Sequence, residues 1–328
     1  MYPEVESAPA PLHKINCMQD FFSRIDSSLS LPALLDTVAG EFSLGTTLKY
    51  VPILTGYQDC NIDLETTEGK YVVKIFSREK SKERIDDIIW AYTSAAKLGI
   101  PVPKLLGVSH SVRACIFHYF EGKPLTRTPG TDTDFITLTN GMAKIHTMTR
   151  SIRHYYDTMG IVNVSEEYAK KNAALSTEEQ STIIPIINKF HKIKLATFPQ
   201  SIIHGTFEKE NVLKNQDGTL CLLDFGSMDF NASILDIATF IANFTQYADP
   251  IKRNHIIHLI LETYQKSRPL TPPELTALPT LIRSQHAAYV INMSYHMRIE
   301  HDMTKQTQSW LDRGWDGLRA YEKVSRII

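Results

Sequence analysis

The chain has 328 residues, of which 43% are hydrophobic and 22% charged, with 15 glycines and 16 prolines. This composition excludes collagen-like, low-complexity and disordered chains. The 35 basic and 36 acidic residues give a formal net charge of −1, so the basic excess typical of nucleic-acid-binding proteins is absent and we expect no nucleic-acid partner. The length predicts about two domains, or one domain in two lobes.

The sequence also predicts the cellular compartment of the protein. It holds no run of about 18 apolar residues, so we expect neither a transmembrane helix nor a membrane partner. The N-terminal segment MYPEVESAPAPLHK is acidic and lacks the apolar stretch of a secretory signal. The four cysteines form no CxxC pair, which disfavours a zinc knuckle and predicts buried, reduced thiols in a cytoplasmic protein. They are Cys17, Cys60, Cys115 and Cys221. The oligomeric state is left open.

The first part of the chain combines an extension with a β-rich lobe. Residues 1–14 read as a loose tail, and apolar spacing over 15–42 predicts two helices, with Pro32 in the first turn of the second. Three short β-rich segments follow within 47–77, and the last two are joined by a turn that predicts a hairpin. A helix is predicted over 81–98, capped by Ser81. The segments LLGVS and ACIFHYF then predict two more strands.

The remainder of the chain is mostly helical in pattern, with one strand-rich insert at 200–226 that contains a turn at Gln216–Gly218. We therefore predict an α+β fold with a small β-rich N-lobe and a larger, mainly helical C-lobe. The expected division is 1–42 for the extension, 43–118 for the N-lobe and 119–328 for the C-lobe. The helices are expected over 131–149, 165–175, 179–193, 231–246, 251–266, 271–299 and 307–326.

The insert at 200–226 carries the densest group of polar residues among apolar ones. His204-Gly205-Thr206 follows an apolar pair, Asn211 starts the first arm of a predicted hairpin, and Asp224-Phe225-Gly226 ends the second arm. Hairpin pairing would bring Asn211 and Asp224 together, and amide and carboxylate oxygens suit Mg²⁺ held with substrate phosphates. An aspartate at the end of a strand is more often only a turn or a cap, so the compound spacing carries the metal interpretation.

With these residues the chain resembles the aminoglycoside phosphotransferase and choline kinase superfamily, whose fold is similar to that of protein kinases. The resemblance covers roughly residues 45–325. It implies ATP and Mg²⁺ as cofactors and a small-molecule acceptor, with a His-Gly-Asp-x-x-x-x-Asn loop and a following aspartate as catalytic loop and metal site. This chain matches at His204, Gly205, Asn211 and Asp224. It departs at Thr206, where the family has the catalytic aspartate.

The resemblance extends to the N-lobe. The segment from Gly56 to Asn61 resembles a shortened phosphate loop, although its second glycine is missing. Lys74, with apolar neighbours on both sides, resembles the lysine that binds the α- and β-phosphates; the alternative is a solvated edge lysine. The family pairs this lysine with an acid on the next helix, which here offers Glu83, Asp86 and Asp87, and we select Asp87.

Three further segments fit the same family pattern. Backbone groups from Phe117 to Tyr119 resemble the hinge that meets adenine. His146, in GMAKIH, resembles a packing element and is expected to be structural. Asp236 matches an aspartate that braces the catalytic loop, and a polar residue within an apolar helix requires a buried partner.

Thr206 leaves three interpretations open, because a threonine hydroxyl is no base near neutral pH. The first is an active kinase in which Glu208, or less favourably Glu210, replaces the aspartate; the alternative for both acids is solvated loop charge. The second is a pseudokinase that binds ATP as a switch or scaffold. The third is a nucleotidyl transferase, which no residue specifically supports. We favour the phosphotransferase, because both predicted metal ligands, Asn211 and Asp224, are retained.

The acceptor is expected against the helical lobe, around residues 286–302, where polar and aromatic residues interleave. Helical spacing alone explains most of these as half-buried surface. Residues 231–328 hold 11 basic and 9 acidic residues. They lack the acidic excess expected for binding a polycation, so we favour a small hydroxylated metabolite such as an amino alcohol or a sugar. Trp310 and Trp315 either stack on a ligand or, as we favour, pack the last helix.

Overall fold

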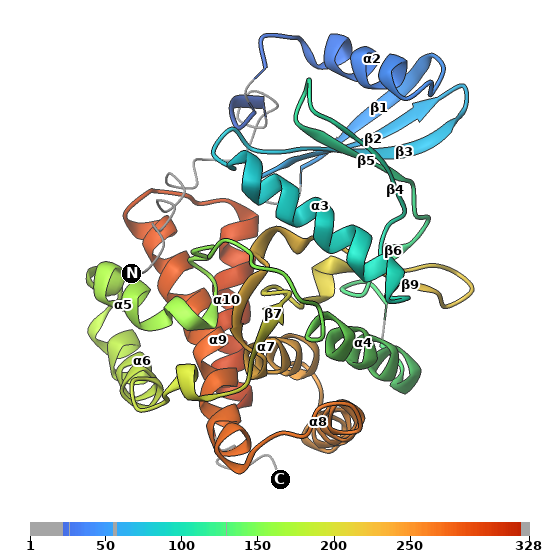
Figure 1. Ribbon diagram of the computed structural model, residues 1–328. Coiled ribbons are helices and arrows are strands. Elements are labelled where there is room, and N and C mark those ends of the chain that lie inside the picture. Colours follow the sequence, from blue (N-terminus) through green and yellow to red (C-terminus); the bar gives the residue numbers. More distant parts are fainter. Residues whose placement is uncertain (1–21, 26, 55–57, 129, 323–328) are drawn as a thin grey trace. The chain divides into compact units, whose positions relative to one another are not determined.

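The computed structural model describes residues 22–25, 27–54, 58–128 and 130–322 (Figure 1). These residues form two compact units. One unit contains the described residues up to Gly122 together with Asn215–Leu223, and the other contains Lys123–Lys214 and the chain from Asp224 onward. The expected boundaries at 42/43 and 118/119 stay predictions. Within the described ranges, no helix is long and apolar enough to cross a membrane.

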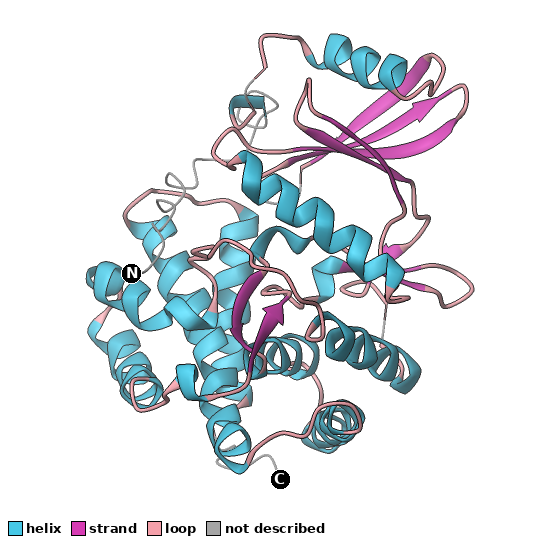
Figure 2. Cartoon of the chain, in the orientation of Figure 1, coloured by secondary structure: helices cyan, strands magenta, loops and turns pink. Residues whose placement is uncertain are grey.

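The first unit is built on a five-stranded sheet with the order β1-β2-β3-β5-β4, in which all neighbours are antiparallel. Figure 2 shows these strands in magenta. The tight β2–β3 hairpin turns at Thr66–Gly69, so the predicted hairpin is confirmed. All five predicted strands are present, and their bounds are β1 Thr47–Ile53, β2 Cys60–Thr66, β3 Gly69–Ile75, β4 Leu105–Ser109 and β5 Ala114–His118.

Helix α2, Leu31–Glu41, covers one face of this sheet. It begins where predicted, with Ser30 accepting a hydrogen bond from the Ala33 amide and Pro32 in the first turn. Its apolar side chains form one buried cluster with alternate residues of the strands, because successive strand residues point to opposite faces. That cluster includes Leu34, Leu35, Val38, Ile62, Leu64, Val73 and Ile116. The helix predicted before it, from residue 15, falls mostly outside the described residues.

Helix α3, Lys82–Lys97, contacts the opposite face of the sheet. Ser81 caps it by accepting from the Arg84 amide, as predicted, and Gly99 ends it at a φ of 68°. The ring of Tyr92 packs at 4.8 Å between centroids from that of Phe117 in β5. Phe117 lies opposite Val72 of β3, so strand alternation places Lys74 on this α3 side of the sheet.

The second unit is mainly helical. Three of its helices begin with capping boxes, at Thr131, Ser176 and Thr271, and each predicted helix is found at its expected place with ends shifted by a few residues. The helices are α4 Asp132–Ile145, α5 Val164–Lys171, α6 Thr177–Phe190, α7 Ile234–Thr245, α8 Pro250–Gln265, α9 Pro272–Arg298 and α10 Lys305–Ala320.

Short strands accompany these helices. β6 (Lys123–Pro124) pairs with β8 (Val212–Lys214), and β7 (Gln200–Ile203) pairs with β10 (Asp229–Ala232). Residues 231–233 were expected to be helical, and that prediction is wrong. Their backbone is used in the β7 ladder and its end, so α7 begins only at Ile234. β9 (Leu220–Leu222) belongs to the first unit, and the predicted turn before it is confirmed by the bond from the Gly218 amide to the Asn215 carbonyl.

Helix α9 is the central helix of this unit, and it packs against α5, α6, α7 and α10. Three residues expected on its half-buried surface, His286, Tyr289 and Asn292, are fully buried instead. The expectation was wrong because helical spacing identifies one buried face, whereas neighbours on several sides bury a helix all round. Helix α10 approaches α9 closely because Gly317 has no Cβ. A Cβ at this position would lie 2.1 Å from the His286 imidazole.

The cysteines behave as the composition predicts. The three that the structure describes, Cys60, Cys115 and Cys221, are free and buried. Burial raises the pKa of each thiol to about 12, so they are protonated and act as small apolar side chains. Cys17 lies outside the described residues.

Candidate functional site

The loop after β7 is fixed by a buried aspartate of α7. Asp236 accepts hydrogen bonds from the backbone amides of His204 at 2.7 Å and Gly205 at 2.9 Å, and its carboxylate lies 3.1 Å from Nε2 of His146. The side chains of Asp236 and His146 are fully buried. The buried partner required by Asp236 is therefore present, and His146 has the structural position expected of it.

The charge of Asp236 is retained despite its burial. Burial alone would raise its pKa, but hydrogen bonds and charge from His146 and His204 outweigh this effect and hold the pKa below its ordinary value. His146 is in turn oriented by the hydroxyl of Tyr264, 2.7 Å from its Nδ1. An ionised acceptor binds amide donors more strongly than a neutral one. The ionised Asp236 therefore holds the backbone of His204 and Gly205, where the loop begins.

Gly205 has a φ of 84°, a backbone conformation that side chains rarely adopt. A Cβ at this position would lie 2.2 Å from the carbonyl oxygen of Ser227. Both the backbone angle and the close approach require glycine. The residue between His204 and Thr206 is therefore set by the geometry of the loop itself.

Thr206 and Asn211 lie at the two ends of a short turn. The Asn211 side chain donates through Nδ2 to the carbonyl oxygen of Thr206 at 3.0 Å, and the amide of Glu208 donates to the same oxygen at 2.9 Å. The segment Lys209–Asn211 forms one turn of 3₁₀ helix. Because Nδ2 is used in this bond, Oδ1 is the atom with which Asn211 would bind a cation.

Asp224 occupies a left-handed backbone conformation, with φ 59° and ψ 85°, and its Oδ1 accepts from the Gly226 amide at 3.0 Å. Left-handed non-glycine residues are uncommon and concentrate at functional sites. Among the described residues, no group of three or more His, Cys, Asp or Glu side chains is arranged to hold a metal. A site of one amide, one carboxylate and substrate phosphates fits Mg²⁺, which is commonly held by one or two carboxylates with phosphates and water.

Glu208 is a buried acid on this loop, with 9% of its surface exposed. The hydroxyl of Tyr289, from α9, donates to its Oε1. Burial raises the pKa of Glu208 to about 7; the nearby charge of Arg313 opposes this rise, and the charges of Glu210 and Asp157 add to it. A carboxyl that titrates near neutral pH is suited to take a proton.

Arg313, from α10, lies beside this acid and is nearly buried. It forms an ion pair with Glu210 at 2.7 Å, and its guanidinium lies over the rings of Trp310 at 4.6 Å and Tyr289 at 5.8 Å. Trp310 also packs edge-on against Tyr289. The expected role of Trp310 in packing the last helix is therefore confirmed, and the sequence had given Arg313 no role.

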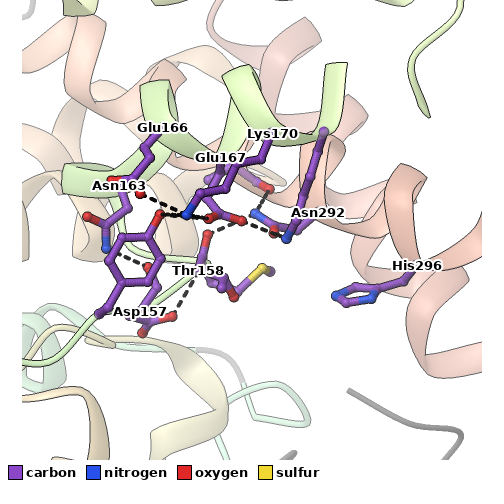
Figure 3. A network of polar contacts seen from close by, with 12 residues as sticks. Asp157, Thr158, Asn163, Glu166, Glu167, Lys170, Asn292 and His296 are labelled. Atoms are coloured by element: carbon purple, nitrogen blue, oxygen red, sulfur yellow. Dashed lines mark hydrogen bonds and ion pairs between the residues drawn. The ribbon is translucent and has the colours of Figure 1, made fainter. Parts of the chain in front are cut away.

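A polar network holds the loop that carries Asp157 (Figure 3). Asn292 of α9 donates to the Thr158 carbonyl at 2.8 Å, and Asn163 donates to the Asp157 carbonyl at 2.8 Å. In the same network Tyr156 donates to Glu167 of α5 at 2.7 Å. Two helices thus fix the backbone around Asp157, whose charge acts on Glu208. The sequence offered no pattern that indicated this acid.

In the first unit, Lys74 pairs with an acid that was not predicted. Its Nζ lies 3.0 Å from Oδ2 of Asp59, and both side chains are almost fully buried. Asp59 immediately precedes β2, whereas the expected acid, Asp87, is buried on α3. The pairing of Lys74 with Asp87 stays a prediction. Lys74 itself is buried, so the alternative of a solvated edge lysine is wrong.

The remaining predicted nucleotide-binding residues lie in the same unit. Asn61 of β2 lies opposite Lys74 in the strand register. Phe117 is buried in β5, and the amide of Tyr119 donates to the Lys70 carbonyl at 3.1 Å while its side chain is partly exposed. Gly56 lies outside the described residues. The roles of these residues stay predictions.

Comparison with known proteins identifies the family to which the chain belongs. Residues 49–270, more than half of the chain, match the model of a phosphotransferase enzyme family. The chain belongs to this family. It is 24% identical over 251 residues to a homoserine kinase of Methylobacillus flagellatus, covering 74% of this chain and 78% of that protein. It is also 24% identical over 277 residues to a homoserine kinase of Bartonella tribocorum, covering 77% and 83%. The chain is accordingly a small-molecule kinase.

Solved structures share the fold. A choline kinase from Streptococcus pneumoniae aligns with a TM-score of 0.60 at 16% identity, over 88% of this chain and 100% of that one. An amicoumacin kinase in complex with AMP-PNP and Ca²⁺ aligns with a TM-score of 0.66 at 13% identity, over 95% and 97%. The predicted α+β kinase-like fold is confirmed, and so is the predicted superfamily.

Proposed function

We propose that the chain transfers the γ-phosphoryl group of ATP to the hydroxyl of a small amino alcohol, with L-homoserine as the first acceptor to test. The observation that supports an active enzyme is Glu208. It lies in the same loop as Thr206, it is buried, and its pKa is raised to about 7. General base catalysis typically contributes ~10²–10⁴-fold to rate, and Glu208 offers a group that performs it without the family's aspartate.

The acceptor oxygen attacks the γ-phosphorus, the bond from that phosphorus to the β–γ bridging oxygen breaks, and ADP leaves. The hydroxyl proton passes to the carboxylate of Glu208. The hydroxyl of Thr206 hydrogen-bonds the acceptor and orients it, and Asp224 would hold the cation that neutralises the phosphate oxygens. A loose transition state depends mainly on positioning and charge neutralisation, so the exchange of aspartate for threonine is tolerated.

The cofactors are ATP and Mg²⁺ in this proposal. Asn211 and Asp224 would hold the cation, which would supply positive charge to neutralise the phosphate oxygens. Asn211 has its side-chain donor engaged with Thr206, which leaves the oxygen as the ligand atom. The residues that we assign to nucleotide binding are Gly56, Asn61, Lys74, Asp87, Phe117 and Tyr119.

Two findings support an amino alcohol over a neutral sugar. The relatives named above are homoserine kinases, and homoserine is an amino alcohol with a carboxylate. The charges of Glu210 and Asp157 both act on Glu208, with Arg313 as the opposing cation. An excess of negative charge attracts an ammonium group and raises its local concentration.

The direct test is release of ADP from Mg-ATP with a panel of acceptors. The panel contains L-homoserine, choline, ethanolamine, 1-amino-2-propanol and glucose, and Asp224→Asn serves as the inactive reference. We expect an amino alcohol to stimulate turnover and the neutral sugar to do so least. If no acceptor stimulates turnover while Mg-ATP raises the melting temperature, the pseudokinase alternative holds. If ATP does not bind, both interpretations fail.

The assignment of Glu208 as the general base is tested by substituting the two glutamates of this loop in turn. Glu208→Gln should lower kcat by ~10²-fold or more, with little change in KM for ATP. Glu210→Gln is the matched control, because Glu210 is more exposed and forms an ion pair with Arg313. Equal losses in the two variants would contradict the assignment of Glu208 as the base.

A further inference from the structure

Lys74 and Asp59 belong to a buried three-residue charge cluster that includes a second lysine. Nζ of Lys80 lies 2.9 Å from Oδ1 of Asp59, while Nζ of Lys74 lies 3.0 Å from Oδ2. The exposed fractions of the three residues are 7% for Asp59, 5% for Lys74 and 6% for Lys80. One carboxylate therefore bridges two ammonium groups within the first unit.

Asp59 is held in place by more than the lysines. Its Oδ1 also accepts a hydrogen bond from the backbone amide of Ser77 at 3.0 Å. Burial by itself would raise the pKa of Asp59, but the charges of Lys80 and Lys74 dominate and hold it well below its usual range. Asp59 is thus ionised, with both oxygens engaged.

Lys80 is fixed on the other side. It lies in the turn between β3 and α3, where its amide donates to the Ser77 carbonyl at 3.0 Å. The guanidinium of Arg113 donates to the carbonyls of Ser77 at 3.0 Å and Lys80 at 2.5 Å. The Lys80 ammonium also donates to Gln58 at 2.8 Å. The backbone and the charged end of Lys80 are both ordered.

We propose that Asp59 is the acid that positions Lys74 for the phosphates of the nucleotide, and that Lys80 is the cation that holds Asp59 in place. The proposal rests on the proposed binding of ATP. It gives the phosphate-binding lysine a partner at the residue before β2, in addition to the acid that the sequence predicts on helix α3. Asp59 and Lys80 are positioning residues, since they act through Lys74.

The physical reason is the cost of ordering a lysine. A long, flexible lysine side chain loses rotamer entropy when it is ordered, and an ion pair that fixes it before binding reduces the entropy cost that nucleotide binding has to offset. A lysine ammonium has three donors, so a bond to Asp59 is compatible with bonds to phosphate. Lys80 adds a second positive charge, so the three side chains together carry one net positive charge.

The experiment compares Asp59→Asn, Lys80→Met and Lys74→Met in the full chain. ATP and adenosine binding are measured by calorimetry, and kcat and KM are measured for ATP and for the acceptor. We expect Asp59→Asn to weaken ATP binding ~10-fold or more and Lys80→Met to weaken it less. Adenosine has no phosphate, so its affinity should be unchanged, and so should the acceptor KM. Asp63→Asn, in the strand β2 that follows Asp59, is the matched control.

A double-mutant cycle tests whether Asp59 acts through Lys74. If it does, Asp59→Asn combined with Lys74→Met should bind ATP no more weakly than Lys74→Met alone. Asp59→Glu should recover part of the ATP affinity. Additive losses, or equal loss of adenosine and ATP affinity, would overturn the proposal.

The proposal and the proposed function fail in different ways. If the wild-type chain does not bind ATP, the function fails. If the wild type binds ATP and Asp59→Asn behaves like Asp63→Asn, only this inference fails. An Asp87→Asn variant that loses ATP affinity beside an unaffected Asp59→Asn would return the positioning role to α3.

Discussion

The carboxylate of Asp236 accepts the backbone amide of Gly205 at 2.9 Å, so a side chain in the first turn of α7 fixes a residue 31 positions earlier in the chain. The His204 amide binds the other carboxylate oxygen. The loop after β7 is therefore anchored at its start by one buried charge. Its geometry depends on a single side chain that does not itself belong to the loop.

We predict that Asp236→Asn destabilises the chain by about 3 kcal/mol and lowers kcat more than KM. An amide keeps one acceptor oxygen but leaves His146 and one backbone amide poorly matched, and breaking a buried charge pair typically costs about 3–5 kcal/mol. Urea unfolding and steady-state kinetics measure the two effects. Asp132→Asn is the control, because Asp132 and His255 form an exposed pair worth about 1 kcal/mol at most.

Gly205→Ala should cost activity and about 2–3 kcal/mol of stability. The added Cβ would lie 2.2 Å from the Ser227 carbonyl, at a φ of 84°, and strain of this kind costs about 1–3 kcal/mol. Gly218→Ala is the matched variant, since Gly218 also has a positive φ, 90°, in an exposed turn. Equal losses of stability in the two variants would contradict a specific clash with Ser227.

Glu208 should make stability depend on pH. Its pKa is about 7 in the folded chain and near 4.5 when unfolded, so the folded state keeps the proton up to a higher pH than the unfolded state. The stability contributed by this group is present at pH 4.5 and is lost as the pH rises towards 7. The difference corresponds to about 3 kcal/mol. Glu208→Gln should remove this loss, so its Tm should rise relative to that of the wild type between pH 5 and pH 8. Parallel Tm curves across this range would refute the prediction.

Gly317→Ala tests the contact between α9 and α10. The Cβ would lie 2.1 Å from Nδ1 of His286, a fully buried imidazole stacked on Tyr321. Overpacking of this kind typically costs about 1–3 kcal/mol. Gly40→Ala in α2 has nothing within 4 Å and should be neutral or stabilising by up to about 1 kcal/mol. Thermal unfolding of both variants measures the difference.

Much of the fold follows from local sequence patterns. The alternation in β2, the cap at Ser81 and the stop at Gly99 each follow from the geometry of a few adjacent residues. The prediction of helix at 231–233 failed, because pairing with β7 draws on residues about 30 positions away. Local spacing carries no information about such a partner.

The same distinction applies to the candidate site. Local sequence was enough to indicate the family: His204, Gly205, Asn211 and Asp224 stand at the spacing of its phosphoryl-transfer loop, and Thr206 departs from that pattern. The pairing of Lys74 with Asp59, and the burial of Glu208 with its hydrogen bond from Tyr289, became visible only in the folded chain. Ion pairing and burial depend on which distant segments pack together, and a single sequence does not give the spatial distances between such segments.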